Sequence, residues 1–371
     1  MKSQKTVFVV SLIILVSLAC SEPINLSTWL APSREALRDI FTLLGAVTPQ
    51  VEEVGKTEVQ TTLTPALIAL EATATVAPEI GQTPSAAAAG SAVEEVAAAV
   101  PSGRILFTCQ VDKISGHDQI CMINADGTGF TQLTEDLALQ HLYPSWAPDG
   151  LSFVFTGIAD GIAKIYEITL TGDLKVVGDV YGQLYAPMIS PDGKKIVFQR
   201  YISNDEQYIS VMNRDGSALM DLVEYYGAKD PVWSADGKSI LFTAAEEGTT
   251  ETYVMNSSGI TIQKVSALSG LAGRPDWSSQ DAIATYSGSR DQHNREIVLM
   301  EADELPVTLT STGDNLSPSF SPDGEWIVFT SYRDSEWNVD GCEIYIMRKD
   351  GTDVRRLTAN DYCDYQPRWG K

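Results

Sequence analysis

The sequence predicts an all-β fold, and three features support this: short strand-like runs, turn signals between them, and a tandem repeat that contains both. One copy of the repeat occupies residues 318–358 and reads PSFSPDGEWIVFTSYRDSEWNVDGCEIYIMRKDGTDVRRLT. Its four apolar or alternating runs are short and rich in β-branched and aromatic residues, which is typical of strands rather than helices. The unit is therefore predicted to be a four-stranded antiparallel meander.

The connections inside this unit have the sequences of turns and loops. The first is Ser321-Pro-Asp-Gly, with proline at the second turn position, which suits its fixed φ, and glycine at the fourth. The third connection, Arg348-Lys-Asp-Gly, has the same order of acid and glycine. A longer polar loop at 332–341 joins the second strand to the third. These connections fit an up-and-down meander of four strands.

The unit recurs along the chain and predicts a closed architecture. Six prolines open the copies at intervals of 43, 44, 44, 43 and 49 residues: Pro144, Pro187, Pro231, Pro275, Pro318 and Pro367. Four of them are followed two positions later by tryptophan: Trp146, Trp233, Trp277 and Trp369. A period of about 40–45 residues with four strands per repeat predicts the blades of a β-propeller rather than a solenoid.

The repeat resembles a known family. Its consensus, P-x-W-S-P-D-G, then I-x-F-T-S, then E-I-Y-x-M-x-x-D-G, then L-T, is similar to the WD-like repeat of TolB-type propellers and of the N-terminal propellers of dipeptidyl-peptidases and prolyl oligopeptidases. The resemblance covers residues 102–371 and implies a six-bladed propeller. The N-terminal α/β domain of TolB has no counterpart in this sequence. Since propellers serve many unrelated functions, the resemblance implies fold more strongly than function.

The two ends of the repeat region predict how the ring closes. After residue 102 the chain begins with Arg104-Ile-Leu-Phe-Thr, which matches a second strand rather than a first. The missing first strand is supplied at the other end by Pro367-Arg-Trp. We therefore expect a first blade made of three N-terminal strands and one C-terminal strand, which leaves only short, protected sheet edges.

The N-terminal 101 residues are predicted to contain a targeting segment and a linker. Residues 1–20 have a basic start, an apolar run and a small-residue site ending at Cys20, as in a bacterial lipoprotein signal peptide. Ser17 stands where that signal usually has leucine, so cleavage as an ordinary secretory signal is the alternative. Residues 21–101 are rich in Ala, Thr and Pro, which predicts a flexible linker, and 102–371 form the propeller.

Cysteine usage fits an oxidising compartment. If Cys20 carries a lipid, four cysteines remain, and we expect the pairs Cys109–Cys121 and Cys342–Cys363. The first pair lies on neighbouring strands, and the second joins two connections that emerge on one face. Free buried thiols are the alternative. The sequence argues against a metal site, because it has no C-x-x-C and no histidine at ligand spacing from a cysteine pair.

The charge of the chain limits its partners. The formal net charge is −23 at pH 7, with 49 acidic and 26 basic residues. Nucleic acid is therefore not an expected partner, because binding phosphates requires lysine and arginine. Many of the acids belong to the repeated Asp-Gly turns, so the acidity does not by itself indicate a cationic ligand.

The sequence gives little support for catalysis. The three histidines, His117, His141 and His293, occupy no repeated position and are expected in polar loops, and there is no G-x-S-x-G nucleophile motif. The alternating acids of the 334–340 loop resemble a calcium loop but lack its final glutamate. We therefore predict no cofactor and a non-enzymatic, monomeric binding module of the cell envelope. The alternative is an envelope hydrolase or lyase that uses acidic residues in the propeller funnel.

The expected binding surface is the face that carries the connections into each first strand and the long loops between second and third strands. Its partner is expected to be an envelope protein or peptide. Tyr, Trp and Arg often dominate binding energy in interfaces. The candidates on this face are Tyr143, Tyr185, Tyr225, Tyr226, Asp230, Arg274, Arg333, Trp337, Tyr362 and Tyr365.

Overall fold

The computed structural model describes residues 100–111, 117–136, 138–246, 248–265, 270–302, 304–334 and 341–371. The predicted signal peptide at 1–20, with Cys20, and almost all of the predicted linker at 21–101 lie outside these residues. Within the described part, no helix is both long enough and apolar enough to cross a bilayer.

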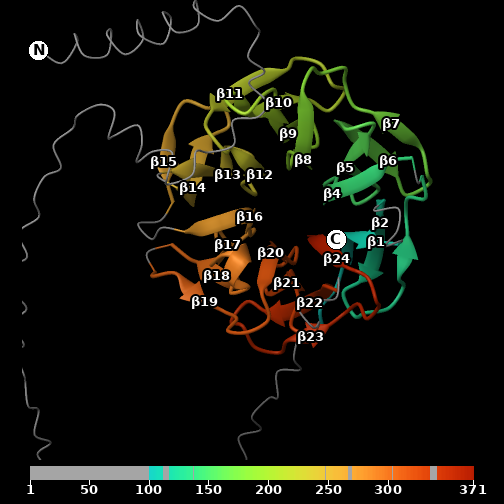
Figure 1. The fold of residues 1–371 in the computed structure, drawn as a ribbon, viewed down its shortest axis with the longest axis vertical. Coiled ribbons are helices and arrows are strands. Elements are labelled where there is room, and N and C mark those ends of the chain that lie inside the picture. Colours follow the sequence, from blue (N-terminus) through green and yellow to red (C-terminus); the bar gives the residue numbers. More distant parts are fainter. Residues whose placement is uncertain are drawn as a thin grey trace, which may run out of the picture. The chain divides into compact units, whose positions relative to one another are not determined.

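The described residues form six antiparallel sheets of four strands, arranged in a ring (Figure 1). This confirms the six-bladed propeller. Blade 1 is β24 (Asp364–Gly370), β1 (Arg104–Gln110), β2 (Asp118–Asn124) and β3 (Thr131–Gln132); blade 2 is β4 (Gln140–Trp146), β5 (Ser152–Ala159), β6 (Ile162–Thr169) and β7 (Leu174–Val176); blade 3 is β8 (Gln183–Ile189), β9 (Lys195–Tyr201), β10 (Gln207–Asn213) and β11 (Met220–Glu224).

In each blade the first-named strand lies nearest the central channel of the ring, and the other three blades have the same order (Figure 1). Blade 4 is β12 (Lys229–Trp233), β13 (Ser239–Glu246), β14 (Thr249–Asn256) and β15 (Ile262–Lys264); blade 5 is β16 (Leu271–Trp277), β17 (Ile283–Ser287), β18 (Glu296–Met300) and β19 (Val307–Thr308); blade 6 is β20 (Asn315–Phe320), β21 (Trp326–Ser331), β22 (Glu343–Arg348) and β23 (Arg355–Arg356). A short 3-10 helix, η2 (Arg290–Gln292), lies in the loop between β17 and β18.

The ring closes as the sequence predicted. β24, the last strand, pairs antiparallel with β1, with Arg104 opposite Gly370 and Cys109 opposite Asp364. One buried cluster joins Ile105 and Trp369 of blade 1 to Val328 of blade 6. The two ends of the propeller are therefore held by a shared sheet and a shared core.

The Asp-Gly turns between first and second strands are stabilised by their own side chains. In blade 6, the Asp323 carboxylate accepts hydrogen bonds from the Ser321 hydroxyl and the Glu325 amide, and Gly324 has a φ of +77°. Blades 3 and 4 repeat these contacts at Asp192 and Asp236. Since positive φ is costly for side chains other than glycine, the Asp-Gly order specifies the turn locally.

The hydrophobic core lies within and between the blades. The second strands repeat a phenylalanine that is fully buried in five blades: Phe107, Phe155, Phe198, Phe242 and Phe329. Clusters cross from blade to blade, as where Ala284 and Ile297 of blade 5 pack with Phe329 of blade 6. These repeated aromatic side chains are core residues, as expected from their period, and they are not available to a ligand.

Candidate functional site

Six residues on the innermost strands share an unusual backbone conformation. The residue before each strand-opening proline has a positive φ, between 29° and 57°, and none of the six is glycine. The pairing of each innermost strand with its neighbour shifts register at this point, which is a β-bulge. We call these six residues the channel ring: Tyr143, Ala186, Asp230, Arg274, Ser317 and Gln366.

The same backbone bulge recurs in every blade, although the residue type at the bulge differs. A left-handed conformation costs an L-residue about 1–2 kcal/mol, so six such residues need support from the surrounding fold. The bulge is therefore a property of the architecture, while the side chain at each position is free to differ. The ring accordingly carries an aromatic, a methyl, an acid, a base, a hydroxyl and an amide.

Arg274 reaches across the channel. Its Nη2 donates a hydrogen bond to the backbone carbonyl of Pro144, 3.4 Å away, and its guanidinium lies 5.1 Å from the centre of the Tyr143 ring. Arg274 is on β16 and Pro144 is on β4, which stand on opposite sides of the ring (Figure 1). The Arg274 backbone amide donates to the Asp230 carboxylate at 3.0 Å. The predicted residues Tyr143, Asp230 and Arg274 therefore meet in the channel.

A second arginine and a glutamine complete these contacts. Arg368 of β24 donates to the backbone carbonyls of Pro318 and Pro275 at 3.4 and 3.3 Å, and it forms an ion pair with Asp276 at 3.3 Å. The Gln366 side-chain oxygen accepts hydrogen bonds from the Thr108 hydroxyl and the Tyr143 amide. These bonds link blade 1 to blades 2, 5 and 6 around the channel.

Burial changes the acid–base behaviour of the channel groups. It lowers the pKa of Arg274 to about 9, and the nearby charge of Arg368 acts in the same direction. Burial, followed by the charge of Asp230, raises the pKa of Tyr143 to about 12, and the same two causes raise the pKa of Tyr286 to about 12. At neutral pH the channel therefore presents a cationic arginine and neutral phenols.

A pocket opens on the face that carries the connections into the innermost strands, which we call the entry face. The pocket has a volume of about 500 Å³ and lies between blades 2 and 3. It is lined by the start of β6, the connection into β8 and the end of β9: Ile162, Lys164, Asp179, Val180, Tyr181, Gly182, Gln183, Tyr201 and Ile202. Tyr181 is 77% exposed, and Tyr226, on the connection into β12, is 68% exposed. The entry face thus combines a ligand-sized pocket with exposed aromatic rings.

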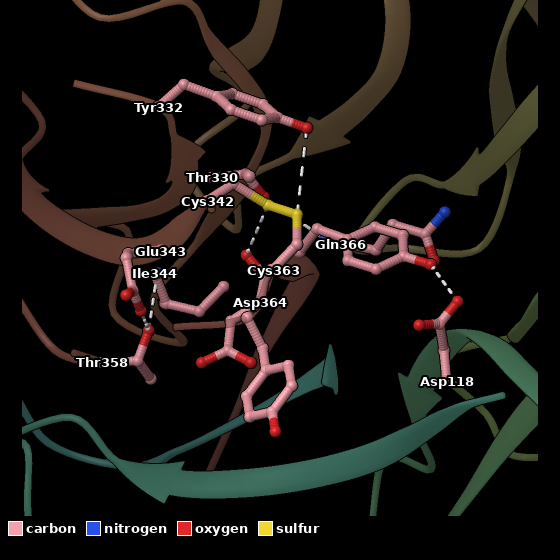
Figure 2. Close-up of a disulfide and its surroundings, with 12 residues drawn as sticks. Asp118, Thr330, Tyr332, Cys342, Glu343, Ile344, Thr358, Cys363, Asp364 and Gln366 are labelled. Carbon is pink, nitrogen blue, oxygen red and sulfur yellow. Dashed lines mark hydrogen bonds between the residues drawn. A yellow bond between two sulfur atoms is a disulfide. The ribbon is translucent and has the colours of Figure 1, made fainter. Parts of the chain in front are cut away.

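A disulfide reinforces the same face at the ring closure. Cys342, at the end of the long blade 6 loop, is bonded to Cys363, on the connection into β24, with a Cα–Cα distance of 4.3 Å (Figure 2). The Asp364 amide donates to the Cys342 carbonyl, and the Tyr332 hydroxyl lies 3.8 Å from the Cys363 sulfur. Cys109 is bonded to Cys121 between β1 and β2. Both predicted pairs are confirmed.

Asp364, next to this disulfide, is a buried carboxylic acid (Figure 2). Burial raises its pKa to about 7, and the charge of Glu343 contributes in the same direction, while hydrogen bonds from Thr358 and Asn360 oppose the shift. Its protonation therefore changes near neutral pH, within a corner that joins blades 1 and 6.

Among the other predicted binding residues, Tyr185 packs edge-on against Tyr143, whereas Arg333, Tyr362 and Tyr365 make contacts elsewhere. The Arg333 guanidinium lies over the rings of Phe329 and Tyr345, and the Tyr365 hydroxyl donates to Asp118 at 2.7 Å. The Tyr362 amide donates to the Asn360 side chain. Trp337 belongs to residues 335–340, outside the described part of the chain, as does most of the calcium-like loop.

Two channel residues were not identified from the sequence, and one histidine was predicted in the wrong environment. Gln366 and Arg368 were not singled out, although they flank a strand-opening proline that was, so listing the neighbours of each proline would have found them. His141 was expected in a polar loop, which is wrong. It is buried on β4, with Nδ1 2.9 Å from the Gln119 side-chain oxygen, and burial lowers its pKa to about 4. Its packing against Phe155 makes it a core residue.

Comparisons with known proteins agree with this fold. A family model described as the TolB beta propeller domain matches residues 169–369. An uncharacterised protein of Agrobacterium fabrum is 28% identical over 60% of this chain and 60% of its own, and the Tol-Pal system protein TolB of Francisella tularensis is 26% identical over 51% and 45%. This chain thus covers less than two thirds of either relative. The crystal structure of TolB from Acinetobacter baumannii superposes with a TM-score of 0.64, at 22% identity over 73% of this chain and 67% of that one.

Proposed function

Because the chain belongs to the TolB β-propeller family, we propose that it is a non-enzymatic binding module of the cell envelope, whose entry face recognises a protein or peptide. The observation that carries this proposal is the pocket between blades 2 and 3, with Tyr181 exposed at its edge. A tyrosine supplies a large rigid contact with a polar end, which is why this side chain often forms the centre of an interface.

The channel supports the same function. The bulge gives each blade a left-handed backbone residue at the channel ring, while the side chains differ from blade to blade. A fixed scaffold with variable side chains is the arrangement that lets one fold acquire different partners. The Cys342–Cys363 bond would reduce the ordering cost of binding at the neighbouring corner, where the 335–340 loop carries Trp337 as a proposed anchor.

The competing function is an envelope hydrolase or lyase that uses acids of the funnel. The Asp276 carboxylate is engaged by Arg368, by the Ser319 hydroxyl and by the Phe320 amide. Asp230 accepts the amide of Arg274 and so supports the bulge. Because both carboxylates already have structural hydrogen-bond partners, they favour the binding module over the hydrolase or lyase.

The proposed location is outside the cytoplasm, on a membrane. Two disulfides fit an oxidising compartment, since cytosolic thiols are kept reduced. We further propose that Cys20 carries the lipid and that residues 21–101 act as a tether, so that a monomeric propeller can reach its partner away from the bilayer surface.

Site-specific photo-cross-linking in the native host tests the function. A photoreactive residue in place of Tyr181 or Tyr226 is expected to capture the same envelope protein. The control position is Lys194, whose side chain is 80% exposed in an Asp-Gly turn on the opposite face. Equal capture from all three positions would indicate non-specific encounter, and the absence of adducts from both tyrosine positions would contradict an entry-face partner.

A further inference from the structure

Arg274 is a buried charge whose hydrogen bonding is incomplete. The residue is 5% exposed, and a guanidinium has five N–H donors. One of them reaches Pro144 at 3.4 Å, while Nε and Nη1 have no hydrogen-bond partner among the described residues. An unpaired buried charge is strongly destabilising, so a native structure that contains one calls for a bound water or ion at that position.

The neighbouring charges do not neutralise Arg274 directly. Asp276 forms its ion pair with Arg368, and Asp230 receives the backbone amide of Arg274 rather than its guanidinium. Within the described part of the chain, no carboxylate forms an ion pair with Arg274. The charge of Asp230 and the cation–π contact with Tyr143 partly compensate the charge of Arg274, and they leave its Nε and Nη1 without a hydrogen bond.

A small cavity adjoins these groups at the channel axis. Its volume is about 10 Å³, which is room for one small particle. It is lined by Ala186, Pro187, Met188, Asp230, Pro231, Arg274 and Arg368. The charged lining residues are Arg274, Arg368 and Asp230, Arg368 is paired with Asp276 outside the lining, and the remaining lining side chains are apolar.

We propose that this cavity binds one small monovalent anion of halide size, held by the guanidiniums of Arg274 and Arg368. The charge of Arg368 is already paired with Asp276, so an anion would pair with the Arg274 guanidinium and accept its free N–H groups. A water molecule prefers two to four polar partners and leaves the charge uncompensated. Arg274 belongs to blade 5 and Arg368 to blade 1, so the bound anion would link these two blades and stabilise the closed ring.

Chloride and bromide are the probes. The full chain is expected to broaden the ³⁵Cl NMR line beyond the effect of a channel variant, and bromide is expected to reverse the broadening by competition. In thermal unfolding, replacing sodium gluconate with sodium chloride at equal ionic strength should raise Tm by about 2 °C or more once chloride exceeds its Kd about tenfold. Gluconate is too large for the cavity. At equal ionic strength it therefore controls for effects of salt that do not involve binding in the cavity.

Two variants locate the site. Arg274→Met is expected to lose both the excess broadening and the halide-specific rise in Tm, whereas Arg214→Met should retain both. Arg214 is a suitable control because it is a partly buried arginine that pairs with Glu167, outside the channel. If Arg274→Met does not fold, the wild-type measurements still decide. A wild-type protein without halide-specific broadening or stabilisation contains only water in this cavity, and the proposal is then wrong.

Discussion

The indole Nε1 of Trp369 donates a hydrogen bond to the backbone carbonyl of Ser102 at 2.8 Å, joining residues from the two ends of the propeller. Trp369 also packs in the cluster shared by blades 1 and 6. The closure of the ring thus depends on the last few residues, which complete blade 1 from the opposite end of the chain.

Deleting residues 367–371 is expected to abolish cooperative thermal unfolding or lower Tm sharply, because the innermost strand of blade 1 is lost and neighbouring edges are exposed. The milder Trp369→Phe removes the hydrogen bond to Ser102, worth about 1 kcal/mol, and should lower Tm by about 2 °C or more. Calorimetry checks both changes. A truncated protein that melts like the intact one would rule out this account of closure.

The channel-ring conformation predicts opposite responses at Ala186, which has a φ of +49°. Ala186→Gly should change stability by no more than about 1 kcal/mol, since relief of the left-handed strain offsets the greater chain entropy of glycine. Ala186→Val should cost at least about 2 kcal/mol, because a β-branched side chain is a severe outlier at positive φ. Urea unfolding measures both values. Equal stability of the two variants contradicts a left-handed backbone at this position.

Asp364 predicts a specific pH dependence of stability. Its pKa is raised from the ordinary 3.8 to about 7 in the folded protein, so between about pH 4 and pH 7 the folded state binds more protons than the unfolded state. The contribution of Asp364 to stability therefore falls as pH rises through this window. Asp364→Asn lacks that loss, and its Tm relative to wild type should increase from pH 4.5 to pH 8. The exposed Asp205→Asn is the control. Parallel Tm curves for wild type and Asp364→Asn would refute the shift.

Variants at the Cys342–Cys363 disulfide and at Trp337 are expected to affect stability and binding separately. Replacing Cys342 and Cys363 with serine should cost about 2–4 kcal/mol, because the unfolded chain regains the freedom of a 21-residue loop. Trp337→Ala should instead weaken binding of a captured partner at least tenfold while leaving Tm almost unchanged. Unfolding curves and titrations with the partner measure the two effects. Unchanged affinity of Trp337→Ala places the contact elsewhere on the entry face.

The anchoring proposal is tested at Cys20. Cys20→Ser should move the protein from the membrane fraction to the soluble extracytoplasmic fraction of a bacterial host, because the lipid has no attachment site. Fractionation followed by immunoblotting measures the shift. If the wild type is already soluble outside the cytoplasm, the segment ending at residue 19 is an ordinary cleavable signal.

The sequence by itself determined the repeated parts of this protein. The turn at Asp323-Gly324 depends on atoms within five residues of each other, and the second-strand alternation that buries Phe329 is equally local. Six copies of such signals specify the number of blades. The composite first blade followed by counting strands, and the cysteine pairs followed from the meander that those strands form.

Only the tertiary structure decided what meets in the channel and what is buried. The Arg274 donor and the Pro144 acceptor are 130 residues apart and belong to opposite blades, so their contact exists only after the ring has closed. The positive φ before each proline arises from bulges between paired strands, which no single residue type reveals. His141 illustrates the same limit: a polar residue in a polar sequence becomes a core residue once Gln119 of the neighbouring blade 1 and Phe155 of its own blade pack around it.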